Sequence, residues 1–214
     1  MNALLQSAQP LLAQAFALWG SPVTWLEIVA FVLSVAMVVC NMRVNPLGWP
    51  LAMGSSLLYA LLFASSRLYG EAGLQLFFVA MAVWGWWQWL RHAEHGTDPL
   101  PVRRMAPRQR AWALAATALG WPALALLLAR ATDSDVPWMD ALPTVASITG
   151  TVLLGRKWIE NWLVWLGVNL FSLVLFGHKG LWLTVLLYAV FAVMSVAGWR
   201  AWRRLQGEAP SAMA

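Results

Sequence analysis

Long stretches of this chain are apolar on every face of a helix, and short polar stretches separate them. A hydrocarbon layer about 30 Å thick requires about 20 helical residues to cross it. We predict seven membrane-spanning helices, at residues 24–41, 47–64, 70–90, 111–129, 139–154, 158–176 and 181–202. The predicted fold class is therefore an all-α polytopic membrane protein.

The chain also contains an internal repeat. The segment Gln75 to Trp89 returns 113 positions later as Tyr188 to Trp202, with six identities. The second span aligns with the sixth at an offset of 116, which pairs Asn45, Trp49 and Ser56 with Asn161, Trp165 and Ser172, and Met53 with Asn169. An odd number of spans in each copy would invert the second copy unless one helix lies between them. The pattern therefore predicts two parallel three-helix repeats joined by a linker helix, a 3+1+3 arrangement.

These boundaries divide the chain into six segments. We expect an N-terminal interfacial helix at 1–20, the first repeat at 21–90, a cytoplasmic loop at 91–110, the linker helix with an outer loop at 111–137, the second repeat at 138–204 and a C-terminal tail at 205–214. The first segment has no positive charge, so it is a poor signal peptide. Its apolar residues fall near one helical face, which favours an interfacial helix over the alternative, a disordered tail.

Composition and charge agree with a membrane protein. With 61% hydrophobic and 11% charged residues, the chain cannot cover a soluble globule with polar surface. Its net charge of +5 does not indicate a nucleic-acid partner, because the basic residues lie between apolar spans. When the spans alternate, 11 Lys and Arg residues fall on one side and 3 on the other. The positive-inside rule then places the C-terminus in the cytoplasm and the N-terminus outside.

A polar stripe runs along the sixth span. Asn161, Trp165 and Asn169 are spaced four residues apart, and Ser172 follows three residues later, so all four share a helical face. An amide inside hydrocarbon must find partners within the protein or its ligand, and polar groups at this depth often mark a functional site. We therefore predict that the stripe binds substrate. The alternative is an interhelical hydrogen bond, which contributes about 0.6 kcal/mol.

Other spans supply further candidates for the same site. Gln75 and Tyr188 occupy repeat-related positions at the same depth, as a site between two repeats would require. Trp49 and Ser56 correspond to Trp165 and Ser172 in the repeat alignment, so we expect Trp49 to form a stacking wall. Polar contacts between helices remain the alternative for Gln75 and Tyr188. In the fifth span, Thr144, Ser147 and Thr151 are better explained as hydroxyls that bond to their own helix.

The chain has sixteen tryptophans, and most of them fit aromatic belts at the two membrane interfaces. Trp112, Trp158 and Trp202 are predicted at the cytoplasmic belt. A gate is predicted from a separate set, Trp86, Gln88, Trp199 and Trp182. Gly85 and Gly198 precede two of these tryptophans, and the alternative is that both glycines only allow helices to approach closely.

Catalytic and cofactor motifs are missing from the sequence. His92 and His95 flank Glu94 without a third fixed ligand, which is a weak metal signal. There is no phosphate-binding glycine loop and no nucleophile elbow. We therefore predict no enzyme activity, no cofactor and no metal. Glu27 and Glu160, two acidic residues within the predicted spans, lie near span ends, so coupling to a proton or sodium gradient is disfavoured.

Three segments carry a family resemblance: GWWQW after the third span, NWLVWLGVN in the sixth and LYAVFAVMSVAGWRAW in the seventh. They resemble the PnuC family of bacterial vitamin B3 transporters, across all seven spans. The resemblance implies a duplicated SWEET-like fold, a homotrimer in the bacterial inner membrane and facilitated diffusion of nicotinamide riboside. It also implies trapping by a cytoplasmic nicotinamide riboside kinase. A SWEET-like sugar carrier, a carrier of another vitamin such as thiamine, and a non-transporting scaffold or channel subunit remain alternatives.

The chemistry of this substrate fits the candidate residues. Nicotinamide riboside carries a cationic pyridinium, which a tryptophan face binds at about 2 kcal/mol when both are desolvated. Asn, Gln and Tyr side chains can pair with its amide and hydroxyls. A phosphorylated nucleotide would need cationic partners within the membrane, and the spans supply none. We therefore expect the mononucleotide to be rejected.

Overall fold

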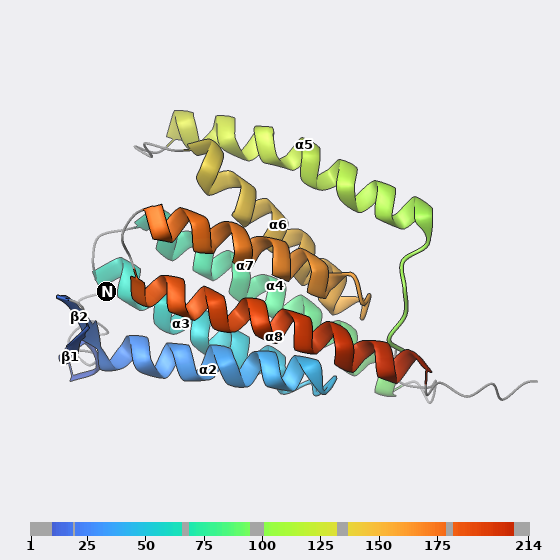
Figure 1. Ribbon diagram of the computed structural model, residues 1–214, viewed down its shortest axis with the longest axis horizontal. Helices are drawn as coiled ribbons and strands as arrows, with labels where there is room; N and C mark the ends of the chain where they lie inside the picture. Colours follow the sequence, from blue (N-terminus) through green and yellow to red (C-terminus); the bar gives the residue numbers. More distant parts are fainter. Residues whose placement is uncertain are drawn as a thin grey trace, which may run out of the picture. The chain divides into compact units, whose positions relative to one another are not determined.

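The computed structural model describes residues 10–18, 20–65, 69–94, 101–131, 137–178 and 182–207. It forms two compact units, Met1–Trp87 and Gln88–Ala214. The helices are α2 (Trp25–Met42), α3 (Gly48–Ser65), α4 (Tyr69–Glu94), α5 (Pro107–Ala131), α6 (Pro137–Gly155), α7 (Asn161–His178) and α8 (Trp182–Gly207) (Figure 1). Each predicted span coincides with one of these helices. Helix α4 begins in the first unit and ends in the second.

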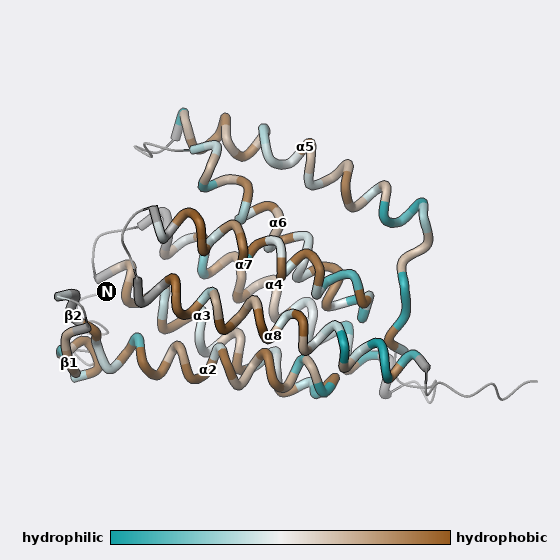
Figure 2. The backbone as a smooth tube through the Cα atoms, in the orientation of Figure 1, coloured by the Kyte–Doolittle hydropathy of each residue, from teal (hydrophilic) through white to brown (hydrophobic). Residues whose placement is uncertain are grey.

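The apolar character of the helices is uneven. In the described residues, three helices are long and apolar enough to cross a membrane: Trp25–Met42, Pro107–Arg130 and Val185–Gln206. Gly48–Ala64 and Asn161–Leu175 are shorter apolar helices. Hydrophilic segments gather at the start of α5 and the end of α8 (Figure 2). Large apolar side chains such as Val174 and Val193, each 70% exposed, face outward, as expected of helices that contact hydrocarbon.

The repeat is visible in the helix boundaries at a single offset. Both ends of α3 and α7 differ by 113 positions, and the same holds for α4 and α8. Val44 and Lys157, also 113 positions apart, share a left-handed backbone conformation, with φ of 55° and 52°. The structure therefore corrects the offset of 116 that the sequence indicated for the second and sixth spans.

Tryptophan packing shows why the offset matters. The Trp49 ring fills the space next to Gly85 in α4, and the Trp162 ring fills the space next to Gly198 in α8. Trp162 is therefore the structural counterpart of Trp49, whereas Trp165 lies against Gly150 in α6. The sequence alignment paired Trp49 with Trp165 because the residue type is the same. In the structure, the tryptophans that correspond are the two that pack against a glycine of the next helix. At the corrected offset Asn169 corresponds to Ser56 rather than Met53.

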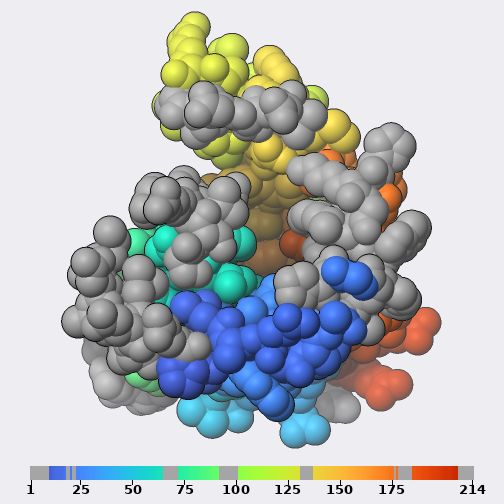
Figure 3. Space-filling model, turned by 90° about the vertical axis from the view of Figure 1, so that its left-hand side faces the viewer, coloured from blue at the N-terminus to red at the C-terminus, as the bar shows by residue number. Residues whose placement is uncertain are grey.

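The N-terminal segment is a hairpin. Strands β1 (Gln14–Leu18) and β2 (Ser21–Thr24) pair antiparallel, so the interfacial helix predicted for 1–20 is wrong over Gln14–Leu18; residues 1–9 lie outside the described part. Gly20 has a φ of 84°, which glycine adopts at little cost and which turns the chain. Figure 3 views the molecule from the end that carries this hairpin, drawn in dark blue.

The hairpin leads directly into α2 through a capping box. The Thr24 hydroxyl accepts a hydrogen bond from the Glu27 backbone N–H at 3.2 Å. The Glu27 carboxylate in turn accepts from the Thr24 backbone N–H at 2.7 Å. This reciprocal pair satisfies two donors at the helix start. Glu27, which the sequence placed near a span end, therefore serves as a helix cap.

In the second unit, α6 packs against α5 and α7, and α7 packs against α8. Trp202 has no exposed surface and meets Trp162 edge to face, with ring centroids 5.6 Å apart. Trp158, 7% exposed, packs with Met105 and Leu153. The belt prediction is therefore wrong for Trp158 and Trp202, because protein rather than the interface covers both. Trp112, 76% exposed, is placed as a belt residue should be.

Both ends of the predicted loop at 91–110 are helical in the structure, and residues 95–100 lie outside the described part. Helix α4 continues to Glu94, and α5 begins at Pro107. Between them, the Arg103 N–H donates to the Lys157 carbonyl at 3.1 Å, and the Ile159 N–H donates to the Arg103 carbonyl at 3.0 Å. This bridge holds residues 158–160 outside a helix. The sixth span therefore begins at Asn161 rather than at 158.

Candidate substrate-binding residues

Polar side chains link α7 to α8 at two levels. The Asn169 amide nitrogen donates to the Ser195 hydroxyl at 3.1 Å, and Ser195 donates to the Phe191 carbonyl at 2.8 Å. Ser172 and Tyr188 share a second side-chain hydrogen bond. Asn169 and Ser172 are 5% and 3% exposed. These four residues form what we call the α7–α8 polar pairs, and they place amide and hydroxyl groups within an otherwise apolar helix pair.

Trp165 belongs to the same face of α7, four residues before Asn169. It is half-buried, and its indole lies against Gly150 in α6, where a Cβ atom would be 3.0 Å from the ring. The absence of a side chain at position 150 is what allows the ring to approach α6. The structure thus brings Trp165, Asn169, Ser172 and Tyr188 together in one unit.

Asn161 is separated from these residues by its local contacts. It is the first residue of α7 and is completely buried. Its amide nitrogen donates to the Trp158 carbonyl at 2.7 Å, which stabilises the turn before the helix. Its Oδ1 atom has no hydrogen-bond partner in the described structure. Asn161 therefore shares a helical face with the stripe but has a structural contact of its own.

The remaining binding candidates lie in the first unit. Trp49 is 2% exposed and packs on Gly85, while Ser56 and Gln75 are half-buried. A polar contact between helices in this unit involves two serines. The Ser34 and Ser55 hydroxyls are 2.7 Å apart, and Ser55 also bonds to the Ala30 carbonyl at 3.1 Å. This contact joins α2 to α3.

Three of the predicted gate residues, Trp86, Gln88 and Trp199, are half-buried. The side chain of the fourth, Trp182, lies outside the described residues. Beside them, Gly85 and Gly198 each receive the ring of a tryptophan from another helix. Close helix approach therefore accounts for both glycines, and the gate remains a prediction for the tryptophans.

Sequence reasoning missed Ser195, Ser34 and Ser55. A signal for Ser195 was present, because Tyr188 and Ser195 are seven residues apart and so share a face of α8. The expectation for the α6 hydroxyls is confirmed: Thr144 and Thr151 donate to the carbonyls of Asp140 and Ser147, each at 2.9 Å. These hydroxyls are engaged by their own helix.

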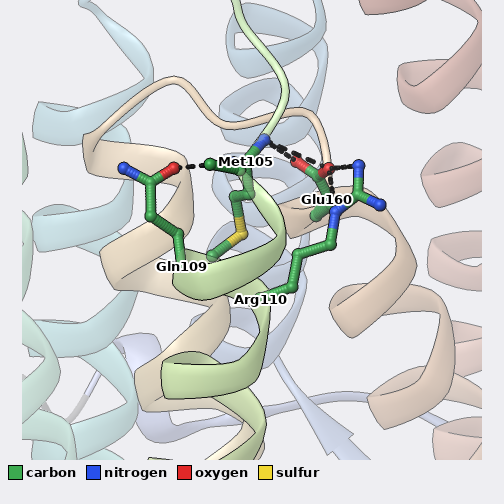
Figure 4. A network of polar contacts seen from close by, with 5 residues as sticks. Met105, Gln109, Arg110 and Glu160 are labelled. Atoms are coloured by element: carbon green, nitrogen blue, oxygen red, sulfur yellow. Dashed lines mark hydrogen bonds and ion pairs between the residues drawn. The ribbon is translucent and has the colours of Figure 1, made fainter.

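Charged side chains lie close together in the segment that joins α6 to α7. Lys157 is 5% exposed, and its ammonium lies 4.7 Å from the centroid of the Trp89 ring. Burial lowers the pKa of Lys157 to about 8, because removal from water disfavours the charged form. The Glu160 carboxylate accepts from the Met105 N–H and pairs with Arg110 at 2.9 Å (Figure 4). These contacts fix the segment before α5 against the start of α7.

The described residues contain no group of three His, Cys, Asp or Glu side chains that could hold a metal ion. The side chains of His92 and His95 lie outside the described part. What the described site offers is therefore an aromatic face, amide and hydroxyl groups, and apolar walls. Such a set can bind a small polar molecule by stacking and hydrogen bonding.

Comparison with known proteins identifies the family. Residues 24–204 match the family model described as nicotinamide mononucleotide transporter. The chain belongs to this family. The riboflavin/roseoflavin transporter RibM of Streptomyces davaonensis is 30% identical over 89% of this chain and 90% of its own length. The nicotinamide riboside transporter PnuC of Escherichia coli is 27% identical over 68% of this chain and 71% of its own length.

A solved structure leads to the same family. The crystal structure of the vitamin B3 transporter PnuC superposes with a TM-score of 0.72 and 26% identity, and covers 87% of this chain and 83% of that one. The PnuC resemblance seen in the sequence is thereby confirmed. The protein is a multi-pass membrane transporter of the PnuC family.

Proposed function

We propose that this protein carries nicotinamide riboside across the bacterial inner membrane by facilitated diffusion. The observation that carries the proposal is the match to the PnuC family over residues 24–204. The α7–α8 polar pairs support it, because their groups suit this substrate. The Asn169 amide and the Ser172, Tyr188 and Ser195 hydroxyls can exchange their mutual hydrogen bonds for bonds to the carboxamide and ribose.

Trp165 supplies the aromatic face for the pyridinium ring. It is half-buried and lies one helical turn from Asn169, so one substrate can stack on the indole and reach the amide. In the first unit, Ser56 and Gln75 correspond to Asn169 and Tyr188 at the offset of 113 and are also proposed as binding residues. Trp49 and Asn161, which are buried by packing and by a turn contact, are assigned these structural roles instead. Trp86, Gln88 and Trp199 are proposed to close the cytoplasmic end, and Trp182, at the opposite end of α8, is proposed to belong to a gate on the outer side.

The proposed architecture is a 3+1+3 arrangement with α5 as the linker. The constant offset of 113 between α3 and α7 and between α4 and α8 supports two copies of one unit. The excess of Lys and Arg on one side of the alternating spans supports a cytoplasmic C-terminus and an outer N-terminus. A homotrimer is the assembly that the family resemblance implies.

Transport is proposed to be uncoupled. Glu27 caps α2 and Glu160 pairs with Arg110 outside α7, so these two carboxylates are engaged at helix ends rather than at the membrane centre. Net uptake then needs a sink, which a cytoplasmic nicotinamide riboside kinase would provide. Phosphorylation would add charge that these apolar helices cannot neutralise, and the product would stay inside.

A second substrate, riboflavin, is favoured by one observation. RibM aligns over 90% of its own length at 30% identity, which is slightly more than the PnuC proteins share with this chain. Riboflavin is neutral and has a three-ring system, so it would stack on tryptophan without a cationic contribution. The two candidates therefore differ in charge as well as in size.

Uptake by purified protein in liposomes separates these functions. We expect saturable uptake of labelled nicotinamide riboside. An excess of unlabelled nicotinamide riboside should abolish this uptake, whereas the same concentration of riboflavin, thiamine or sugar should not. Stronger competition by riboflavin would transfer the assignment to that vitamin. A complete lack of saturable flux would favour a scaffold or channel subunit instead.

The coupling claim needs its own measurement. Collapse of the proton and sodium gradients, at a clamped membrane potential, should leave initial uptake unchanged. The potential must be held constant because the substrate is itself a cation. A large fall in uptake under these conditions would contradict facilitated diffusion.

A further inference from the structure

A groove of about 630 Å³ runs along α5 and α6 in the second unit. At one end Gly120 of α5 lies against Val145 of α6, where a Cβ atom would be 3.0 Å from Val145 Cγ1. Beyond this contact, the Trp121 indole N–H donates to the Trp138 carbonyl at 2.9 Å and closes the helix pair. The groove extends from here toward Met105, Arg156 and Trp158.

The walls of the groove suit hydrocarbon. They are formed chiefly by Ala113, Ala116, Ile148 and Val152, with Trp112 beside them. Thr149 also reaches the groove, but its hydroxyl already bonds to Thr117 at 2.8 Å and to the Val145 carbonyl at 3.2 Å. A polar occupant would therefore find few partners along the walls, whereas an apolar chain would lose nothing by entering.

One end of the groove is basic. The exposed Arg156 guanidinium lines this end, 5.1 Å from the centroid of the Trp158 ring. Arg104, on the segment that leads into α5, and Arg108, in the first turn of α5, are also exposed. The acidic residue nearby, Glu160, is already paired with Arg110 at 2.9 Å. The groove therefore joins apolar walls to a cationic end. An anionic lipid is complementary to it, because the lipid joins an apolar chain to a negatively charged headgroup.

We propose that this groove holds one acyl chain of an anionic phospholipid from the cytoplasmic leaflet, with the phosphate at Arg156. The leaflet follows from the proposed orientation, which places the basic residues at the cytoplasmic surface. Nicotinamide riboside does not fit, because it is polar and its positive charge would meet Arg156.

The test is native mass spectrometry of the full chain in detergent, with phosphatidylglycerol and phosphatidylcholine of identical acyl chains. Phosphatidylglycerol should bind about tenfold more tightly, because its phosphate is not neutralised within its own headgroup and can form a charge-assisted bond to Arg156. Arg156→Gln should abolish that preference and leave phosphatidylcholine binding unchanged. The matched control is Arg203→Gln, a change at an exposed arginine on α8.

A second variant tests the apolar walls. Ala116→Phe fills the groove and should weaken both lipids about tenfold, whereas Ala118→Phe, on the same helix but outside the groove lining, should weaken neither. Equal effects of the two phenylalanines, or equal binding of the two lipids by the unchanged protein, would overturn the proposal. So would Ala116→Phe if it altered the oligomeric state and left lipid binding intact, since the groove would then be a contact between copies.

This test is independent of the transported substrate. Lipid binding is measured without nicotinamide riboside, so it stands if the uptake assay favours riboflavin. A negative lipid result would likewise leave the uptake assay unaffected.

Discussion

The ring of Trp162 in α7 occupies the space that a side chain at Gly198 in α8 would need. Gly198→Ala would place a methyl group within 2.5 Å of the ring, so the two helices must separate. We expect a loss of about 2 kcal/mol in unfolding free energy, as overpacking typically costs. Thermal unfolding of the purified protein in detergent measures the effect.

Gly167→Ala is the matched control. Gly167 is exposed on α7, and a Cβ atom there meets nothing within 4 Å. Alanine at this site should be neutral or stabilising by up to about 1 kcal/mol, because it favours the helix. Equal destabilisation by both changes would show that the Trp162 contact is not the cause.

The Glu160 carboxylate joins the segment before α5 to the start of α7. It accepts from the Met105 N–H at 3.1 Å and from Arg110 Nε at 3.1 Å. Glu160→Gln keeps one acceptor and loses the charge, so we expect a loss of about 1 kcal/mol, reduced by the solvent around half-exposed Arg110. Hydrogen exchange at Met105 and Ile159 should quicken. Arg108→Gln, at an exposed arginine, should change neither measurement.

The helices could be predicted from sequence because their apolar stretches are long and apolar on every face, whereas a helix of a soluble protein has one apolar face. The predicted spans coincide with α2 to α8, with ends displaced by a few residues. The N-terminal hairpin was missed because four of the five residues in β1 are apolar or small, and they fit a helical face as well as a strand. Only the backbone of Gly20, at a φ of 84°, decides between them.

The candidate site was predictable only in part. Spacing alone placed Trp165, Asn169 and Ser172 on one face of α7, as the structure has them. It could not show that Asn169 bonds to Ser195, since the rotation of α8 depends on packing at Gly198. Trp162 was missed for the same reason. Residue identity in the sequence alignment paired Trp49 with Trp165, whereas packing in the structure pairs Trp49 with Trp162.

Trp165 should carry most of the stacking energy for a cationic substrate. We expect Trp165→Ala to weaken nicotinamide riboside binding by about 2 kcal/mol, roughly thirtyfold. Trp165→Phe should restore part of the loss, because it keeps an aromatic face against Gly150. Calorimetry on the purified variants measures both. Trp112→Ala, at a residue 76% exposed, should leave affinity unchanged.

The Asn169 amide should contribute less than Trp165. Its present partner, Ser195, already donates to the Phe191 carbonyl and keeps that bond when Asn169 turns to a substrate, so the cost of exchange is small. We expect Asn169→Ala to weaken binding by about 1 kcal/mol, and Ser195→Ala to weaken it less. Well-folded Asn169 and Trp165 variants with unchanged affinity would remove this face from the site and favour Gln75 and Tyr188.

Lys157 should make stability depend on alkaline pH. Burial lowers its pKa in the folded protein to about 8 from the ordinary lysine value of 10.5. Between these values the unfolded chain binds the proton and the folded chain releases it, so unfolding free energy rises with pH, by at most about 1.4 kcal/mol per pH unit. Below pH 8 both states are protonated, and the contribution of this group is constant and unfavourable.

Lys157→Met tests this dependence, because it removes the charge and keeps a side chain at a position whose φ is 52°. The stability difference between the two proteins should change between pH 8 and 10.5, with the variant relatively more stable at the lower end. Trp89→Leu removes the ring 4.7 Å from the ammonium and should lower the Lys157 pKa further, since the cation–π contact favours the charged form. Parallel pH profiles for the unchanged protein and Lys157→Met would show that Lys157 is solvated as an ordinary surface lysine.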